Sequence, residues 1–142
     1  MNETTTTPTI FIIFGITGDL AGRKLLPALL NLYVSKKLPQ KFAVVGFSRR
    51  PFTREDFRTF IREHMNIKPG QYKEEEVKHF IDHIYYEQGN FDASSSYAQL
   101  AQRLKNIDDS FHQCSNKLFH LSIPPSLYES IFQHLSNSGL TI

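Results

Sequence analysis

Four short apolar segments alternate along the chain with longer stretches in which apolar residues recur every three or four positions. The first, residues 10–14, reads IFIIF and is apolar throughout, which is typical of a strand buried on both faces of a parallel sheet. The other three are FAVVGF at 42–47, a short segment at 84–87, and KLFHLSI at 117–123. Strands that alternate with helices predict an α/β fold with a parallel sheet.

The stretches between these segments have helical periodicity. They predict helices over residues 19–35, 53–65, 73–83, 94–107 and 125–135. Thr53, with Asp56 three residues later, is suited to cap the second helix, and Pro27 predicts a kink or a restart within the first. The residues expected on the buried side of the first helix are Leu20, Leu25, Leu26, Leu29, Leu30 and Tyr33.

The order of these elements predicts a Rossmann-type, doubly wound domain. We expect the strand order 3-2-1-4, with a ligand crevice at the carboxyl ends of strands one and four. Residues 1–8, rich in threonine, are expected to be a flexible lead-in, and residues 9–142 the N-terminal part of the domain. The last three residues, 140–142, begin an apolar segment where another strand would start, so we expect an incomplete sheet and an excerpt of a longer protein.

The turn after the first strand carries candidate phosphate-binding residues. Residues 15–21 read G-I-T-G-D-L-A, in which glycine permits a sharp turn and close approach of the backbone, and Ala21 lets the helix pack closely on the sheet. The N–H groups of Gly18, Asp19 and Leu20 would then face a pyrophosphate at the positive end of the helix dipole. The alternative is a plain turn closed by a capping Asp19, but the strand before and the helix after favour phosphate binding.

The end of the second strand bears on which dinucleotide would bind. NAD-binding domains usually place an acidic residue there for the ribose 2′-hydroxyl, whereas this chain has Ser48, Arg49 and Arg50. A serine and two guanidinium groups would hold a 2′-phosphate through charge-assisted hydrogen bonds. At about 1.5–3 kcal/mol, one such bond favours NADP over NAD roughly ten- to a hundredfold. The alternative is an exposed basic corner without a ligand.

Composition and charge restrict the function classes. The chain has 142 residues, 40% of them hydrophobic and 21% charged, and fits one globular domain. A net charge of +2 indicates no dedicated nucleic-acid surface, and no apolar run approaches the roughly 18 residues of a membrane span. The N-terminus lacks the pattern of a signal peptide, so we expect a cytoplasmic location. A single cysteine, Cys114, agrees with a reducing compartment and is interpreted as a packing residue.

Several histidines and charged residues have a structural interpretation. His79 and His83 are four residues apart and share a helix face, but no third ligand is evident, so no metal site is predicted. His120 lies within an apolar segment and is interpreted as a core or ligand-side residue rather than a base. Glu74 and Lys78 are expected to form a stabilising pair one helical turn apart.

Three segments together resemble one family. GITGDLAGRKLLPALLNLY fits the pattern G-A/G-S/T-G-D-L-A-x-R-K-L-x-P-A-L, VVGFSRRPF fits I-V-G-x-A/S-R, and FHLSIPPSLYESI fits Y-x-A/S-x-A/P-P-x-x-F/Y. These patterns, in this order, are those of the glucose-6-phosphate dehydrogenases, which the chain resembles over nearly its whole length. The resemblance implies an enzyme that oxidises C1 of glucose 6-phosphate by hydride transfer to NADP, giving 6-phosphogluconolactone for the pentose phosphate pathway.

The resemblance also implies roles for single residues. Residues 15–22 would wrap the pyrophosphate, Arg49 would grip the 2′-phosphate with Arg50 beside it, and Lys24 would lie near the substrate phosphate. Gly22 departs from the lysine that many members carry there, which leaves one less positive charge near the phosphates. The cofactor-binding residues implied in this way are Gly15, Ile16, Thr17, Gly18, Asp19, Leu20, Ala21, Gly22, Arg49, Arg50, Asn90, Phe91 and Tyr128.

The family's catalytic segments are not in this sequence. Its E-K-P-F-G strand and its R-x-D-H-Y-L-G-K segment, which holds the general-base histidine, would lie beyond Ile142, as would the substrate domain. No catalytic residue is therefore predicted here, the chain alone is expected to be inactive, and the full-length protein is expected to be a homo-oligomer. Two alternatives stay open. One is a stand-alone NADP-binding or regulatory module. The other is a sugar-nucleotide or NAD-linked short dehydrogenase, which would require an acidic residue at the end of the second strand, where this chain has none.

Overall fold

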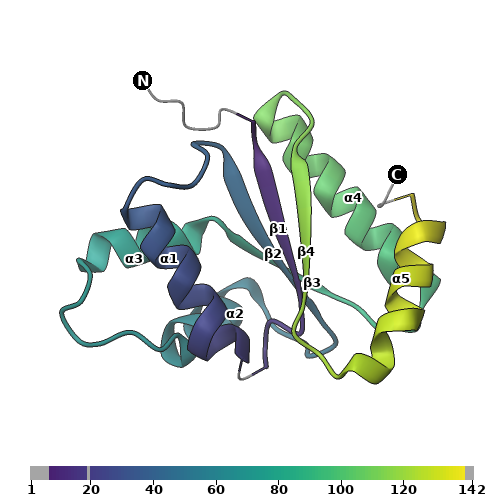
Figure 1. The fold of residues 1–142 in the computed structure, drawn as a ribbon, viewed down its shortest axis with the longest axis horizontal. Coiled ribbons are helices and arrows are strands. Elements are labelled where there is room, and N and C mark those ends of the chain that lie inside the picture. Colours follow the sequence, from purple (N-terminus) through teal and green to yellow (C-terminus); the bar gives the residue numbers. More distant parts are fainter. Residues whose placement is uncertain (1–6, 19, 140–142) are drawn as a thin grey trace.

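One parallel sheet organises the molecule. The structure is a computed structural model, and it describes residues 7–18 and 20–139. Within these residues the sheet has four parallel strands in the order β3-β2-β1-β4, which confirms the predicted α/β class and strand order (Figure 1). The strands are β1 (Thr9–Phe14), β2 (Phe42–Ser48), β3 (Ile84–Gln88) and β4 (Asn116–Leu121).

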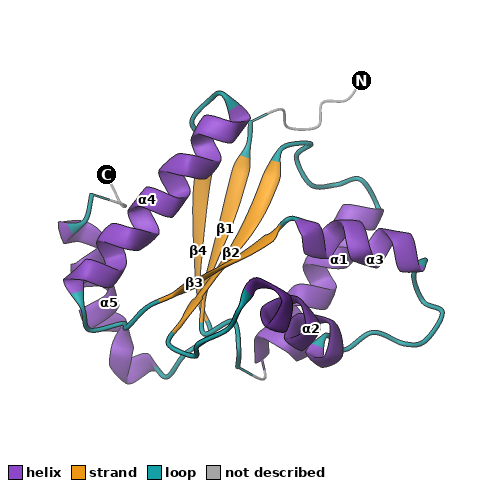
Figure 2. Cartoon of the chain, turned by 180° about the vertical axis from the view of Figure 1, so that it is seen from behind, coloured by secondary structure: helices purple, strands orange, loops and turns teal. Residues whose placement is uncertain are grey.

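Helices cover both faces of the sheet, as a doubly wound fold requires. They are α1 (Leu26–Val34), α2 (Arg54–His64), α3 (Glu74–Asp82), α4 (Ser94–Phe111) and α5 (Tyr128–Asn137). The first three lie on one face, and α4 and α5 lie on the other (Figures 1 and 2). The apolar pattern of the central strands β1 and β2 follows from this arrangement, because both of their faces are covered.

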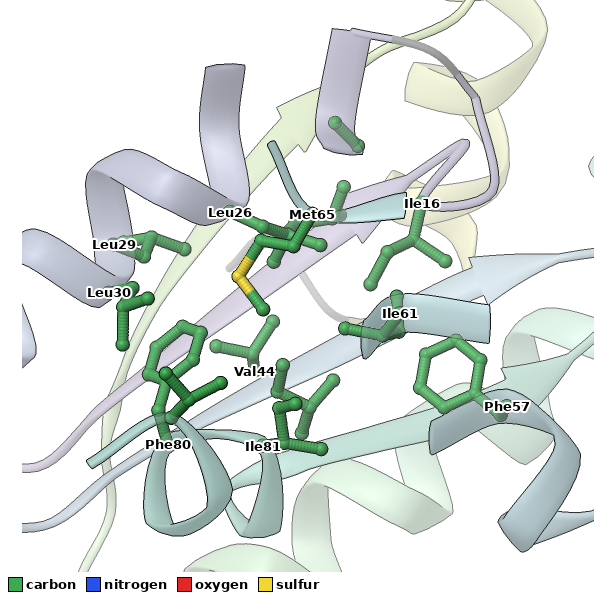
Figure 3. Packing of buried hydrophobic residues seen from close by; sticks show 14 of the residues in the cluster. Ile16, Leu26, Leu29, Leu30, Val44, Phe57, Ile61, Met65, Phe80 and Ile81 are labelled. Atoms are coloured by element: carbon green, nitrogen blue, oxygen red, sulfur yellow. The ribbon is translucent and has the colours of Figure 1, made fainter. Parts of the chain in front are cut away.

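Two clusters of buried side chains flank the sheet. The cluster under α1, α2 and α3 includes Ile16, Leu26, Leu29, Leu30, Val44, Phe57, Ile61, Met65, Phe80 and Ile81 (Figure 3). The cluster under α4 and α5 includes Ile10, Ile12, Phe14, Val45, Phe47, Tyr97, Leu100, Leu104, Ile131 and Leu135. Alternate residues of β1 and β2 therefore belong to opposite cores, as the period of two along a strand dictates.

The first helix begins in an unusual way. Residues Ala21–Leu25 form a π-helical turn, which continues directly into α1 at Leu26, with Pro27 in the first turn of α1. Pro27 thus lies where the helix changes from π to α, close to the kink or restart that its position predicts. The expectation that Leu20 packs in the core is wrong, because its side chain is 48% exposed and the side chain that meets the core here is that of Ala21.

Other element ends differ from the predictions by a few residues. Helix α4 continues to Phe111 rather than ending at residue 107, and β4 ends at Leu121 rather than at 123. The last helix, predicted from residue 125, begins as a 3₁₀ turn over Pro125–Leu127 and becomes α-helical at Tyr128. The predicted cap of α2 is confirmed, since the Thr53 hydroxyl oxygen accepts a hydrogen bond of 3.0 Å from an N–H in the first turn.

The start and end of the chain are only partly described. Residues 1–6 of the expected lead-in and residues 140–142 of the expected further strand lie outside the described residues. Pro8, also expected in the lead-in, is buried, and its carbonyl accepts a hydrogen bond of 2.9 Å from the N–H of Asn116. Pro8 therefore belongs to the packed structure.

Three interpretations of single side chains are corrected. His120 is exposed rather than buried, and it lies on β4, the edge strand of the described sheet. Cys114 is also exposed, in the turn before β4, so it is not a packing residue. Glu74 forms its ion pair with Arg62 of α2 rather than with Lys78, because α3 packs alongside α2.

The histidines of α3 make local contacts. The ring of His83 stacks on Phe42 with 4.3 Å between centroids, and its Nδ1 donates to the carbonyl of His79 at 2.8 Å. Among the described residues, no group of three histidine, cysteine, aspartate or glutamate side chains is placed to hold a metal ion.

Candidate functional site

The loops that follow the four strands meet at one edge of the sheet. Phe14, at the end of β1, is level with Phe47 near the end of β2 and with Leu121 at the end of β4. In parallel sheets this edge, where the order of strands reverses, is where ligands bind. Two concave regions open there, one beside the turn after β1 and one between the loops that follow β3 and β4.

Gly15 is required by the fold of the first turn. Its φ is +84°, a conformation that residues with a side chain rarely adopt, and its N–H donates to the Phe47 carbonyl at 3.0 Å. A Cβ atom at this position would collide with the carbonyl oxygen of Ser122, which follows β4. The turn therefore packs directly against the neighbouring strand end. Beside it, the hydroxyl oxygen of Ser122 is buried and has no partner among the described residues.

Gly18 has a different environment. Its N–H donates to the Gly15 carbonyl at 2.9 Å and closes the turn, so the prediction that this N–H faces a pyrophosphate is wrong. Asp19, which shared that prediction, lies outside the described residues. A Cβ atom at Gly18 would meet only backbone oxygens, those of Gly15 at 3.1 Å and Ser122 at 3.8 Å. The outer side of Gly18 therefore stays open to a ligand.

A pocket of about 220 Å³ lies beside this turn, and we call it the glycine-turn pocket. It is lined by Thr17, Gly18, Gly22, Arg50, Phe60 and His64. The described residues of this lining include a hydroxyl, a guanidinium and an imidazole but no carboxylate. This composition suits an anionic group.

Gly22 sits where α2 meets the π-helical turn. It is buried, and a Cβ atom added to it would lie 2.7 Å from the carbonyl oxygen of His64. Its own carbonyl accepts a hydrogen bond of 3.0 Å from the N–H of Asn66. The absence of a side chain at Gly22 thus allows the end of α2 to close one wall of the pocket.

Arg50 lies beside a pair of aromatic rings, those of Phe52 and Phe60, whose centroids are 5.2 Å apart. Its guanidinium carbon lies 4.9 Å from the ring centroids of both Phe52 and Phe60. Such cation–π contacts fix an otherwise flexible side chain. The ring of His64 stacks on Phe60, 4.0 Å between centroids, and its Nδ1 lies 2.9 Å from the Phe60 carbonyl. Because a carbonyl can only accept, Nδ1 carries the proton.

Ser48 does not serve as a phosphate ligand in this structure. Its side chain points inward, the residue is 5% exposed, and its hydroxyl oxygen lies 2.5 Å from that of Tyr86. The expectation that it contacts a 2′-phosphate is therefore wrong, and the two arginines that follow supply the charge of this corner. The Arg49 carbonyl accepts a hydrogen bond of 3.3 Å from Nε2 of Gln88, which ties the corner to β3.

The second concave region brings together three residues predicted for the cofactor. We call it the β3–β4 pocket. Arg49, Asn90 and Phe91 meet there, although the first lies about forty positions before the others in the sequence. The remaining lining residues are Gly89, Asp92, Ile123, Pro124 and Leu127.

Phe91 is held firmly in the wall of the β3–β4 pocket. Its ring stacks on Phe14 with 5.5 Å between centroids, and its carbonyl accepts a hydrogen bond of 2.9 Å from the Tyr97 hydroxyl. Burial raises the pKa of Tyr97, so this hydroxyl stays protonated and keeps donating at neutral pH. The N–H of Asn90 donates to Oγ of Ser96 at 2.9 Å, which fixes the same loop.

Six predicted residues among those the structure describes line neither pocket, namely Gly15, Ile16, Leu20, Ala21, Lys24 and Tyr128. Ile16 and Ala21 are buried in the core under α1, α2 and α3. Lys24 is exposed on the π-helical turn, and Tyr128 is half-buried at the start of α5, where its ring lies 6.1 Å from that of Phe132. Leu127, one residue earlier, lines the β3–β4 pocket instead, together with Pro124. Sequence reasoning missed these two, although both lie within the segment FHLSIPPSLYESI.

Together these features define a class of protein. A strand, a glycine turn and a helix lie beside a basic corner, at the strand-order reversal of a parallel sheet. That arrangement is a dinucleotide-binding domain of the Rossmann type.

The family follows from comparison with known proteins. The family model described as "Glucose-6-phosphate dehydrogenase, NAD binding domain" matches residues 12–142, and the chain belongs to this family. Glucose-6-phosphate 1-dehydrogenase of Chlamydia muridarum is 37% identical over 135 residues, covering 94% of this chain and 27% of the relative. The enzyme of Aggregatibacter actinomycetemcomitans is 40% identical over 129 residues, covering 91% and 26%.

A solved structure agrees. A glucose-6-phosphate dehydrogenase in complex with its substrate glucose 6-phosphate matches with a TM-score of 0.85 and 25% identity, over 97% of this chain and 29% of that protein. The chain thus spans about a quarter of the length of the relatives it matches. None of the described helices is long and apolar enough to cross a membrane.

Proposed function

We propose that this chain is the N-terminal, NADP-binding part of a glucose-6-phosphate 1-dehydrogenase, which oxidises glucose 6-phosphate to 6-phosphogluconolactone with reduction of NADP. The family membership and the substrate-bound relative support the assignment. The observation that carries the cofactor choice is the basic corner of Arg49 and Arg50 at the end of β2, where an NAD-binding domain would have an acidic residue.

The two pockets suit different parts of a dinucleotide. The glycine-turn pocket offers Thr17, the guanidinium of Arg50, and a backbone that a ligand can approach closely at Gly18, so we assign phosphate groups to it. The β3–β4 pocket combines apolar side chains with the polar Asn90 and Asp92 and the positive charge of Arg49, which suits an adenosine ring system whose ribose carries a phosphate. NADP, when bound, accepts the hydride. What this chain contributes is binding and orientation.

The unpartnered hydroxyl of Ser122 supports a ligand at this edge. It lies beside Gly15, where the ends of β1 and β4 meet, and a buried polar atom without a partner is costly in a folded protein. A cofactor or an ordered water in the crevice would satisfy it. Lys24 is exposed within the π-helical turn, and a place for it near the substrate phosphate is part of this proposal. The same holds for Tyr128 at the border of the cofactor.

The experiment is a selectivity measurement on the full-length protein. The full-length protein should form NADPH when supplied with NADP and glucose 6-phosphate, whereas the 142-residue chain alone should not. Arg49→Ala should raise the Kd for NADP roughly ten- to a hundredfold and that for NAD far less. Arg54→Ala, which removes an exposed arginine from the first turn of α2, is the matched control and should change neither Kd. Equal losses for both cofactors in Arg49→Ala would contradict the assignment.

The same proposal includes the assembly and location of the protein. A full-length protein of this family is expected to be a homo-oligomer in the cytoplasm. Analytical ultracentrifugation of the full-length protein tests the first point, since a monomer across the accessible concentration range would overturn it. Fractionation of the source cells tests the second.

A further inference from the structure

We propose that Tyr86 is a positioning residue for cofactor selectivity. Its hydroxyl holds the backbone of residues 48–50 in the path that presents both arginines to the phosphates of NADP. This inference rests on the proposed function, and it concerns a residue of β3 that lies 36 positions from Arg50 in the sequence.

The hydroxyl of Tyr86 links two points of the basic corner. It lies 2.5 Å from Oγ of Ser48 and 2.6 Å from the carbonyl oxygen of Arg50. A hydroxyl has one proton to donate, and a carbonyl can only accept. Tyr86 therefore donates to Arg50, and Ser48 donates to Tyr86. The Ser48 carbonyl, at 3.2 Å, is the more distant acceptor of the two carbonyls. The result is a directed chain of hydrogen bonds from Ser48 at the end of β2, through Tyr86 of β3, to the carbonyl of Arg50 in the basic corner.

The ring of Tyr86 is itself fixed. It stacks on Phe57 with 4.5 Å between centroids and meets Phe52 edge-on at 5.3 Å. Phe52 is also one of the two rings that hold the guanidinium of Arg50. The same aromatic group thus fixes the side chain of Arg50 through its rings and the backbone of Arg50 through the Tyr86 hydroxyl.

Burial keeps this hydrogen bond available. It raises the pKa of Tyr86 above its ordinary value of 10.0, and this effect outweighs the lowering by the Ser48 hydrogen bond and by the charge of Arg50. The hydroxyl consequently stays protonated and donates throughout the neutral range. The inward turn of Ser48 is explained too, since its hydroxyl takes part in this chain and not in ligand binding.

A positioning role and a purely structural role of the Tyr86 hydroxyl predict different effects on the Kd values for NADP and NAD. A hydroxyl that only stabilised the fold would, on removal, affect the binding of NADP and NAD alike. A hydroxyl that positions Arg49, in the pocket assigned to the phosphorylated ribose, acts on the extra phosphate, which NAD lacks. Tyr72 provides the matched control, because its hydroxyl also donates to another element, to Oδ1 of Asn31 at 3.3 Å, but lies in neither pocket.

The test compares Tyr86→Phe with Tyr72→Phe in the full-length protein, with NADP and NAD titrated separately by calorimetry. Tyr86→Phe should raise the Kd for NADP about three- to tenfold and that for NAD by less than about twofold, as expected for the loss of one hydrogen bond. Tyr72→Phe should change neither. Ser48→Ala should shift the NADP value in the same direction by a smaller factor, and it decides the matter if Tyr86→Phe does not fold.

The outcomes separate this inference from the proposed function. If the wild-type protein prefers NADP and the Tyr86→Phe variant keeps the same ratio of the two Kd values, the positioning role is refuted and the proposed function stands. An equal rise in the Kd for both cofactors is one such case, and it is the behaviour of a hydroxyl that only stabilises the fold. A wild-type protein with no preference for NADP overturns both proposals.

Discussion

The two glycines of the first turn should respond in opposite ways to the same substitution. Gly15 has a φ of +84° and no room for a Cβ atom beside Ser122. A Cβ atom at Gly18 would lie 3.1 Å from its nearest neighbour, the backbone oxygen of Gly15, which is tight but does not collide as at Gly15. Gly15→Ala therefore strains the fold, whereas Gly18→Ala places a methyl group on the surface that the cofactor approaches.

The magnitudes follow from these contacts. For Gly15→Ala, the left-handed backbone costs about 1–2 kcal/mol, and the collision with Ser122 adds about 1–3 kcal/mol. We therefore expect a loss of roughly 2–5 kcal/mol in the free energy of unfolding. An unfolding entropy near 2.1 cal/mol/K per residue gives about 0.3 kcal/mol/K for 142 residues, so the Tm should fall by roughly 7–17 °C. For Gly18→Ala, reduced chain entropy in the unfolded state offsets the tight contact, and the change should stay within about 1 kcal/mol.

Cofactor affinity should be reduced more by Gly18→Ala than by Gly15→Ala, the reverse of the order expected for stability. Gly18→Ala should weaken NADP and NAD together, by roughly tenfold or more, because the pyrophosphate is common to both cofactors. Gly15→Ala, measured well below its Tm, should weaken them less. Thermal unfolding followed by circular dichroism and calorimetric titration of both cofactors give the two quantities for each variant. Wild-type affinity in Gly18→Ala, or an unchanged Tm in Gly15→Ala, would refute the distinction drawn between the two glycines.

Four further predictions address the core, the pocket wall, the basic corner and the pH dependence. Leu30→Ala should lower the free energy of unfolding by about 2–5 kcal/mol, measured by denaturant titration, because Leu30 is 0% exposed in the core. Gly22→Ala should cost about 1–3 kcal/mol in the same assay, since its Cβ atom would press on the end of α2, and a stabilised variant would contradict this packing. Arg50→Lys should raise the Kd for NADP in a calorimetric titration, because an ammonium cannot reproduce the contact of a planar guanidinium with both rings, and an unchanged Kd would show that these ring contacts do not matter for binding. The raised pKa of Tyr86 means that its contribution is fully present below pH 10 and is lost as the pH rises further, so wild-type stability should fall more steeply than that of Tyr86→Phe in alkaline melts.

The strands, their order and the glycine turn could be predicted from the sequence because their causes are local. A run such as IFIIF is strand-forming and buried wherever it occurs in a two-sided sheet, and Pro27 interrupts a helix by its own covalent structure. The connection of successive strands by helices then leaves few topologies. The basic residues after the second strand could also be predicted, because they follow the end of that strand directly in the sequence.

Only the tertiary structure decided which side chains line the site and which pack inside the protein. Ser48 looked like a phosphate ligand, but Tyr86, 38 positions away, draws its hydroxyl inward. In the sequence, Gly22 only stands where many family members have a lysine, but in the structure its lack of a side chain makes room for the carbonyl of His64. Leu127 enters a pocket whose opposite wall comes from loops far earlier in the chain. Periodicity and motif spacing describe the chain relative to itself, whereas these outcomes depend on contacts between elements that are distant in sequence, and only packing brings such elements together.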